Sequence, residues 1–190
     1  MQLHLNKPGI RALGVAESFR QGRKSSVLAG VVMRSDFIVD GVAIGKTSVG
    51  GDDATESIVS LNRRFKRNDI NLIMVSGAIL SLYNIVDVDE LSRRSRLPVV
   101  CLTYKETSGI EESIKRHFPY TAETKLKAYR RLGRRTGVLL RSGYKVYVRK
   151  SGLELATLKP VLDAFTLQGS IPEPLRVAKL VARASLLNRS

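Results

Sequence analysis

Cysteine and histidine are almost absent from this sequence, which has one cysteine, two histidines and no tryptophan among 190 residues. A single cysteine cannot form an internal disulfide, and so few thiols and imidazoles offer no zinc-ligand spacing. Cys101 lies within the apolar run from Pro98 to Leu102, so we expect a buried thiol in a strand. No run of 18 apolar residues occurs and the first residues carry no uninterrupted apolar segment, so we expect a cytoplasmic protein without a membrane span.

Acidic residues are also scarce, since 17 Asp and Glu face 32 Lys and Arg and leave a net charge of +15. The excess is uneven, because residues 115–150 contain twelve bases and a single acid, Glu123. Such a surplus suits a polyanionic partner, above all nucleic acid. With 43% hydrophobic residues, a chain of this length can still bury a core without disulfides or structural metals.

Periodic patterns predict three strands at the start of the chain, over residues 11–19, 26–34 and 37–48. Their connections are so short that neighbouring strands must be antiparallel. A helix then begins after Asp52 or Asp53, either of which can serve as its N-cap, and ends near Phe65. The remainder is expected to form strands over 71–76 and 98–104, helices over 88–95, 109–117 and 123–135, a hairpin of strands 138–141 and 145–149, and helices over 154–165 and 173–187.

This order of elements favours one α/β domain over residues 1–190 with a mixed sheet. Three antiparallel strands followed by parallel strands with crossover helices are typical of the ribonuclease H-like class. Seven short segments support the same fold class, among them Tyr83-Asn84-Ile85-Val86-Asp87 and Ile171-Pro172-Glu173-Pro174. The full set, in chain order, is 10–15, 30–34, 40–42, 53–55, 83–87, 97–100 and 171–178.

Together these segments resemble an archaeal family catalogued as domain of unknown function 99, a distant relative of endonuclease V. The resemblance extends from about Ile10 to Ala184 and implies the endonuclease V type of ribonuclease H-like fold. Endonuclease V-like enzymes cleave a phosphodiester beside a deaminated base, using carboxylates that hold Mg²⁺ at the sheet. The resemblance therefore implies which positions should carry acids.

Most of those positions are not acidic here. Related sequences usually have Gly-Ile-Asp-Asp on the first strand, where this chain has Ala16 followed by Glu17. The second acid corresponds to Asp53, which is retained, and the third position is Ser76 before Gly77. An expected histidine after the late Ser-Gly turn is replaced by Leu153.

Electrostatics decides what these differences mean. Two divalent ions about 4 Å apart repel by roughly 16 kcal/mol at an effective dielectric constant near 20, so several carboxylates must neutralise them. Asp53 alone cannot do so. In a regular strand Glu17 points to the opposite face from residue 16, although a bulge could redirect it and Asp52 could add a ligand. We therefore expect no bound cofactor, with Mg²⁺ only if these residual acids suffice.

The basic residues are the stronger functional signal. Tyr120, Tyr129, Tyr144 and Tyr147 lie among them, and aromatic rings beside Lys and Arg suit base stacking combined with phosphate contacts. On the helix expected over 123–135, Leu126 and Tyr129 can face inward. The candidate nucleic-acid contacts are Lys125, Lys127, Arg130, Arg131, Arg134, Arg135, Arg141, Lys145, Arg149 and, on the last helix, Arg176, Lys179 and Arg183.

The leading hypothesis is a non-catalytic nucleic-acid-binding protein on a nuclease-derived fold, with RNA and DNA both open as partners. One alternative is a divergent metal-dependent endonuclease that uses Glu17, Asp52 or Asp53. The other is a structural subunit of a ribonucleoprotein or protein complex, whose basic residues meet an acidic partner. Each alternative predicts a different response to salt and to divalent metal.

Overall fold

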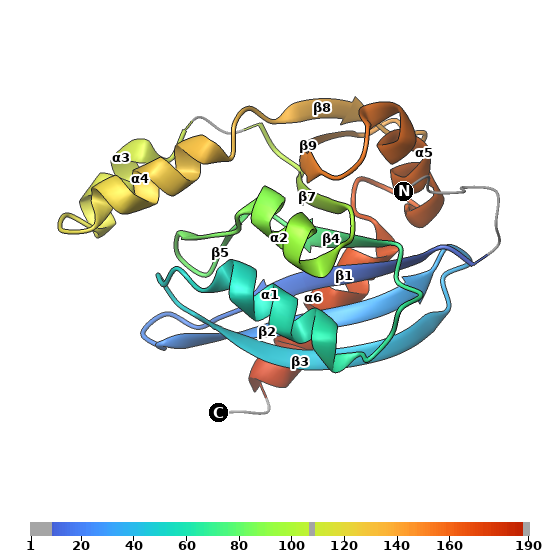
Figure 1. Cartoon of the computed structure of the whole chain (residues 1–190), viewed down its shortest axis with the longest axis horizontal. Helices are drawn as coiled ribbons and strands as arrows, with labels where there is room; N and C mark the ends of the chain where they lie inside the picture. Colours follow the sequence, from blue (N-terminus) through green and yellow to red (C-terminus); the bar gives the residue numbers. More distant parts are fainter. Residues whose placement is uncertain (1–8, 107–108, 188–190) are drawn as a thin grey trace.

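A computed structural model describes residues 9–106 and 109–187, and within these ranges a seven-stranded mixed sheet organises the chain (Figure 1). Its order is β3-β2-β1-β4-β7-β9-β8. The strands are β1 (Arg11–Ser18), β2 (Ser25–Arg34), β3 (Val39–Ser48), β4 (Leu72–Ser76), β7 (Val99–Thr103), β8 (Thr136–Leu139) and β9 (Lys145–Ser151). A separate small ribbon pairs β5 (Ile79–Leu80) with β6 (Asn84–Ile85).

Strand directions follow the expected pattern. β1, β2 and β3 are antiparallel neighbours, whereas β4 runs parallel to β1 and β7 runs parallel to β4. β9 is antiparallel to β7 and pairs with β8, which forms the predicted hairpin at the edge of the sheet. The mixed α/β sheet of ribonuclease H-like type is thereby confirmed.

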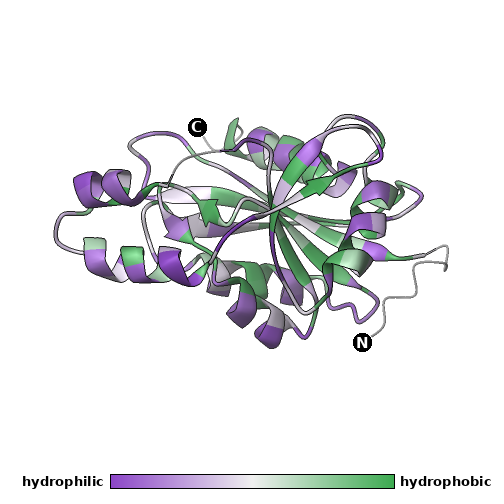
Figure 2. Cartoon of the chain, turned by 90° about the horizontal axis from the view of Figure 1, so that it is seen from above, coloured by the Kyte–Doolittle hydropathy of each residue, from purple (hydrophilic) through white to green (hydrophobic). Residues whose placement is uncertain are grey.

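Six helices are present in the described part of the chain: α1 (Ala54–Arg64), α2 (Val88–Ser95), α3 (Glu111–His117), α4 (Ala122–Arg131), α5 (Leu155–Phe165) and α6 (Glu173–Leu187). Because side chains alternate along a strand, the sheet supports two cores. Leu13 and Val15 of β1 pack with α1 and α2, whereas Ala12 belongs to the core beneath α5 and the start of α6. Figure 2 shows the hydrophobic residues gathered along the strands between these helical layers.

The amino end of α6 lies directly against β1. A Cβ atom on Gly14 would lie 2.4 Å from the backbone carbonyl of Pro174, far inside van der Waals contact. Glycine at this position therefore permits the helix to approach the strand. The approach places the rest of α6 over the carboxyl end of β1, where the resemblance implied a catalytic acid.

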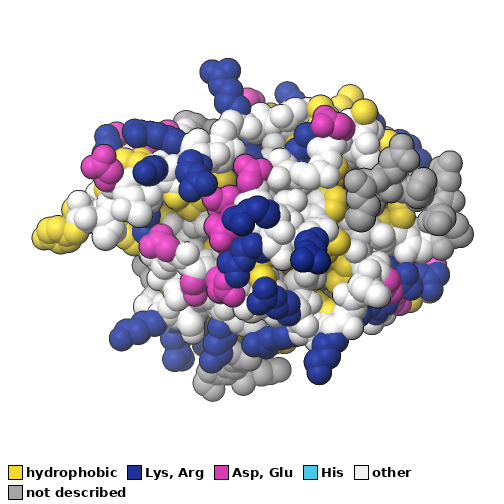
Figure 3. Space-filling model, in the orientation of Figure 1, with side chains coloured by type: hydrophobic (Ala, Val, Ile, Leu, Met, Phe, Trp, Pro, Cys, Tyr) yellow, Lys and Arg dark blue, Asp and Glu magenta, His cyan; other side chains and the backbone are white. Residues whose placement is uncertain are grey.

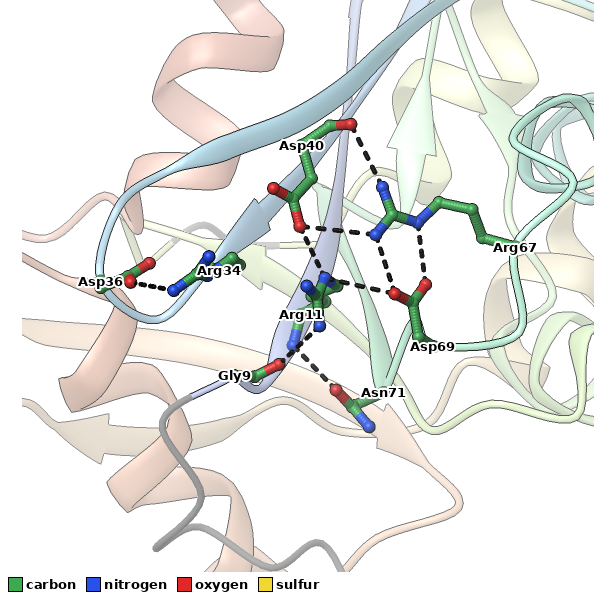
Figure 4. Close-up of polar contacts among 8 residues, drawn as sticks. All are labelled: Gly9, Arg11, Arg34, Asp36, Asp40, Arg67, Asp69 and Asn71. Carbon is green, nitrogen blue, oxygen red and sulfur yellow. Dashed lines mark hydrogen bonds and ion pairs between the residues drawn. The ribbon is translucent and has the colours of Figure 1, made fainter.

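Ion pairs tie the opposite end of β1 to its neighbours (Figure 4). The Nε group of Arg11 donates to Asp40 at 2.6 Å, and the guanidinium of Arg67 forms two hydrogen bonds of 2.8 Å with Asp69. Arg11 also lies 3.4 Å from the Asp69 carboxylate, so the two arginines share both acids. The hydrogen bonds from Arg67 lower the pKa of Asp69 to about 2, against the opposing effect of its partial burial.

The helix expected over 123–135 is shorter than predicted. α4 ends at Arg131, and Gly133 then adopts a left-handed conformation with φ 64°. A glycine in this conformation terminates helices readily, so Arg134 and Arg135 belong to the connection before β8. In Figure 1, α3 and α4 form a hairpin that extends away from the sheet.

Two other expectations concern the burial of Cys101 and the presence of a membrane-spanning helix. Cys101 is buried in β7 as predicted, and this burial raises the pKa of its thiol to about 12. Over the described ranges, no helix combines the length and apolar character needed to cross a membrane.

Candidate functional site

The positions implied to hold the first and third acids are neighbours at the carboxyl ends of two central strands. Val15 of β1 is paired with Val75 of β4, and Ala16 and Ser76 follow them in the parallel register. Ala16 is fully buried and packs with Val31 and with Ala178 of α6. The side chain at position 16 therefore faces the α6 layer, in an apolar contact.

Glu17 faces the other side of the sheet. β1 pairs with β2 without a register shift as far as Ser18, so no bulge redirects this side chain. The hydroxyl of Ser81 donates to Oε2 of Glu17 at 3.2 Å, and the Ser81 and Ser26 hydroxyls lie 2.6 Å apart. The backbone carbonyl of Glu17 accepts a 2.6 Å hydrogen bond from Nζ of Lys179, which brings a cation from α6 to the same strand end.

Asp53 lies at the predicted N-cap position of α1, but its carboxylate does not cap the helix. It turns back to β3, where Thr47 and Ser48 donate to it at 2.9–3.1 Å, and it accepts a 2.6 Å bond from Nδ2 of Asn84. The side-chain oxygen of Asn84 accepts the Ala54 N–H at 2.9 Å and so performs the capping role that we predicted for Asp52 or Asp53.

This hydrogen bonding also fixes the charge of Asp53. Burial disfavours the ionised carboxylate, but hydrogen bonds from Asn84, Ser48 and Thr47 outweigh it and hold the pKa of Asp53 below its ordinary value. The retained acid is therefore ionised, with its oxygens already satisfied by protein donors.

Asp52 points to a different partner. Its Oδ1 atom lies 2.9 Å from Nζ of Lys125, a residue with only 2% of its surface exposed. The same ammonium donates to the carbonyls of Gly51 and Tyr83, at 2.9 and 3.3 Å, and lies over the ring of Phe118. Lys125 is thus an internal cation, and its prediction as a nucleic-acid contact is wrong.

The segment from Ser81 to Tyr83 has an unusual backbone. These three consecutive residues are left-handed, with φ values of 37°, 61° and 62°, although none of them is glycine. Such conformations persist only where surrounding contacts impose them. Here Gly50 N–H donates to the Ser81 carbonyl at 2.7 Å, and Tyr83 contacts Phe118 edge to face. Nothing in the Ser-Leu-Tyr sequence indicated this turn.

The arrangement does not fit a two-metal centre. Within the described ranges, no three His, Cys, Asp or Glu side chains are grouped so that they could hold a metal ion. Asp52 is engaged by Lys125 and Asp53 by four donor groups. Mg²⁺ requires several oxygen ligands in octahedral geometry, which these two engaged acids do not supply.

The predicted basic contacts fall into two groups. Seven of the twelve are exposed, namely Lys127, Arg130, Arg131, Arg134, Arg141, Lys145 and Arg183. Five are engaged within the protein, namely Lys125, Arg135, Arg149, Arg176 and Lys179. Figure 3 shows basic side chains spread over much of one face, with acidic side chains among them.

The engaged arginines have identifiable partners. Arg135 donates to Thr103 and lies over the ring of Tyr147. The Tyr147 hydroxyl donates in turn to Glu106. Arg149 donates through Nε to the Gly133 carbonyl at 3.2 Å and lies over the half-buried ring of Tyr129. The inward position predicted for Tyr129 is consistent with this contact.

On α6 the expected basic stripe is interrupted. Arg176 forms an ion pair with Glu173 and also donates to the carbonyls of Gln168 and Ile171. With Lys179 bonded to Glu17, Arg183 alone of the three is exposed. Apart from Arg183, the exposed members of the predicted set therefore lie on α4, the connection after it and the β8–β9 hairpin.

Comparison with known proteins identifies the lineage. The family model described as endonuclease dU matches residues 8–186, nearly the whole chain. The chain belongs to the endonuclease dU family. A curated relative, a UPF0215 protein of Pyrobaculum calidifontis, is 40% identical over 171 residues, which cover 90% of this chain and 93% of the relative. A UPF0215 protein of Thermococcus sibiricus is 33% identical over 193 aligned residues, covering 97% and 96%.

Solved structures show which fold the chain shares. A protein of unknown function from Archaeoglobus fulgidus superposes with a TM-score of 0.79 at 26% identity, covering 93% of this chain and 98% of that one. Human ENDOV has a TM-score of 0.66 at 15% identity, covering 100% and 91%. Endonuclease V of Ciona intestinalis, solved with an inosine-containing 24mer DNA, has a TM-score of 0.64 at 12% identity, covering 96% and 87%. The expected endonuclease V type of fold is thereby confirmed for this member of the endonuclease dU family.

Proposed function

We propose that this member of the endonuclease dU family binds nucleic acid through its exposed basic residues and does not cleave it. The observation that carries the proposal is the buried Lys125 ammonium bonded to Asp52, beside an Asp53 whose oxygens are satisfied by protein donors. A cation of the protein itself thus neutralises Asp52, one of the two adjacent acids that could contribute to a metal site.

The donor set supports the proposed absence of cleavage. Ala16 and Ser76 supply no carboxylate at the ends of β1 and β4, and Glu17 faces away from position 16. Recruiting Asp52 to a metal would leave the Lys125 charge buried with two carbonyls and an aromatic ring, an arrangement that carries a large desolvation penalty. Lys125 and the hydrogen-bond donors around Asp53 therefore compensate the charges of both acids without a divalent ion.

The exposed bases support the proposed binding. Lys127, Arg130 and Arg134 are exposed, and among the residues with described positions none of them has a carboxylate partner. Unpaired cations in one region attract phosphates strongly, because each contact releases condensed counterions. The Ciona intestinalis endonuclease V bound to DNA supports nucleic acid as the class of partner for this fold.

A divergent metal-dependent endonuclease is the second candidate, favoured by the family's description as endonuclease dU and by the ionised Asp53. Such an enzyme would need Asp53 to exchange its protein donors for metal. Cleavage assays separate it from the first candidate, and the decisive one is described at the end of the Discussion.

Binding is tested by the dependence of affinity on salt, measured by fluorescence anisotropy with labelled DNA and RNA oligonucleotides. Five phosphate contacts give a slope of log K against log salt of about −3.5 on a single strand and about −4.5 on a duplex. Changing Lys127, Arg130 and Arg134 together to Ala should flatten the slope by about two to three. A matched variant that changes Lys24, Arg63 and Arg93 to Ala removes the same charge elsewhere and should leave most of the slope intact. Equal slopes for the two variants would remove α4 from the contact surface.

A further inference from the structure

A cleft separates α4 from β9 and the amino end of α2, at some distance in sequence from the acids discussed above. Its volume is about 280 Å³. Leu132 and Val148 are among its apolar lining residues, and Arg131, Arg134, Arg149 and Lys150 contribute cations. The size lies near the lower limit of small-molecule sites, roughly 300 Å³, so the cleft has room for one compact ligand.

The cations in this cleft are not equivalent. Arg131 lies 3.3 Å from the Asp87 carboxylate, which also caps α2 by accepting the Glu90 N–H. Arg134 and Arg149, in contrast, have no carboxylate partner within the described ranges. One of them is exposed and the other is half-buried. Lys150 also lines the cleft, but its ammonium donates to the Leu153 carbonyl at 2.8 Å. Among the described residues, Arg134 and Arg149 are therefore the two guanidinium groups that face the cleft without an internal carboxylate.

The position of Arg149 suits an anionic ligand. Its Nε group is held by the Gly133 carbonyl and its guanidinium lies over Tyr129, so its orientation is set before a ligand binds. Burial lowers the pKa of Arg149 from its ordinary value, as expected for a cation without a compensating acid. A planar guanidinium with free N–H groups matches the oxygens of a phosphate in a bidentate geometry.

We propose that this cleft binds a single nucleotide, with its phosphate on Arg134 and Arg149 and its base against Leu132 and Val148. Asp87 does not oppose the phosphate strongly, because Arg131 and the α2 N-terminus already engage it. Asp89, an exposed acid at the rim, offers an acceptor for an amino group of the base. The nucleotide is either one unit of a bound strand or a free nucleotide, and in the first case the inference rests on the proposed function.

The test combines two ligands with three single variants of the full chain. Anisotropy with a labelled single-stranded oligonucleotide gives the affinity for a strand, and amide chemical shifts during titration with AMP give the affinity for a free nucleotide. Arg134→Ala removes an exposed cation and does not affect the core. Arg149→Gln removes the guanidinium whose orientation is held by Gly133 and Tyr129. Arg63→Ala, on α1, is the matched control, and thermal melting confirms that each variant folds.

Occupancy of the cleft by a strand predicts that Arg134→Ala and Arg149→Gln each weaken oligonucleotide binding by about five- to tenfold, with Arg63→Ala within twofold of the parent. AMP should shift the amides of Leu132 and Val148 in a saturable way that Arg134→Ala weakens. If the parent binds AMP in this manner but binds no oligonucleotide, a free nucleotide is the ligand, and the proposed strand binding fails while the cleft assignment stands. If the parent binds the strand but neither cleft variant nor the AMP titration shows an effect, the cleft assignment is overturned and strand binding survives.

Discussion

The ammonium nitrogen of Lys125 lies 2.9 Å from Oδ1 of Asp52, although 73 positions separate the two residues in sequence. The contact joins α4 to the loop that precedes α1, and the bond to the Tyr83 carbonyl extends it to the left-handed turn before β6. Lys125 is buried whereas the Asp52 side chain is 73% exposed, so the ion pair lies at the boundary between protein and solvent. A residue of the basic segment thus acts as a structural link between α4, the loop before α1 and the turn before β6.

Replacement of this link should destabilise the protein. Lys125→Met keeps much of the side-chain length but leaves two carbonyls and Asp52 without their donor. We expect a loss of about 2 kcal/mol in the free energy of unfolding, the usual cost of unsatisfied buried acceptors, measured by urea denaturation. Lys127→Met, two residues further along the same helix and exposed, is the matched control and should change stability by less than about 0.5 kcal/mol. Equal stabilities of the two variants would mean that Lys125 is not a structural link.

The ion-pair network at the amino end of β1 should act as an acid-sensitive contribution to stability. The pKa of Asp69 is lowered to about 2 by hydrogen bonds from Arg67, below the ordinary value of about 3.9 for an unfolded chain. Because the folded-state pKa is the lower one, the stabilising effect is present above about pH 4 and is lost as the pH falls toward about 2.

The measurement compares the parent with Asp69→Asn by urea denaturation at several pH values. The parent should be the more stable protein at pH 6, and the difference should shrink steadily between about pH 4 and pH 2. Since Asp69 is 41% exposed, the whole effect is modest. In an Arg67→Met background the pH-dependent part of the difference should largely disappear. A difference that stays constant down to pH 2 would contradict the assigned role of Arg67.

Much of this fold could be predicted because strand patterns and short connections depend on local sequence. α2 and α6 occupy the expected residues. The parallel pairing of β1 with β4, which follows the antiparallel strands, places Ala16 and Ser76 next to each other. The opposite orientations of Ala16 and Glu17 also followed from simple alternation along a regular strand.

The details of the candidate site depend on contacts that are distant in sequence. Asp53 has the residue type and position of a helix cap, but Asn84, 31 residues away, takes that role and binds the carboxylate as well. Helical periodicity placed Tyr129 inward, and Lys125 lies on the same face one turn earlier, yet lysine is rarely expected in a buried position. Its burial depends on carbonyl acceptors from two loops, and nothing in the basic segment reveals them.

The most direct test of binding without cleavage measures affinity and cleavage on the same labelled DNA oligonucleotides. Single-stranded and duplex oligonucleotides with one deoxyuridine or one inosine are first titrated by anisotropy, then incubated at saturating protein with Mg²⁺ or Mn²⁺ and separated on a denaturing gel. We predict salt-sensitive binding and intact strands under every metal condition. Metal-dependent cleavage that is abolished by Asp53→Ala would contradict the account and identify the protein as a divergent endonuclease.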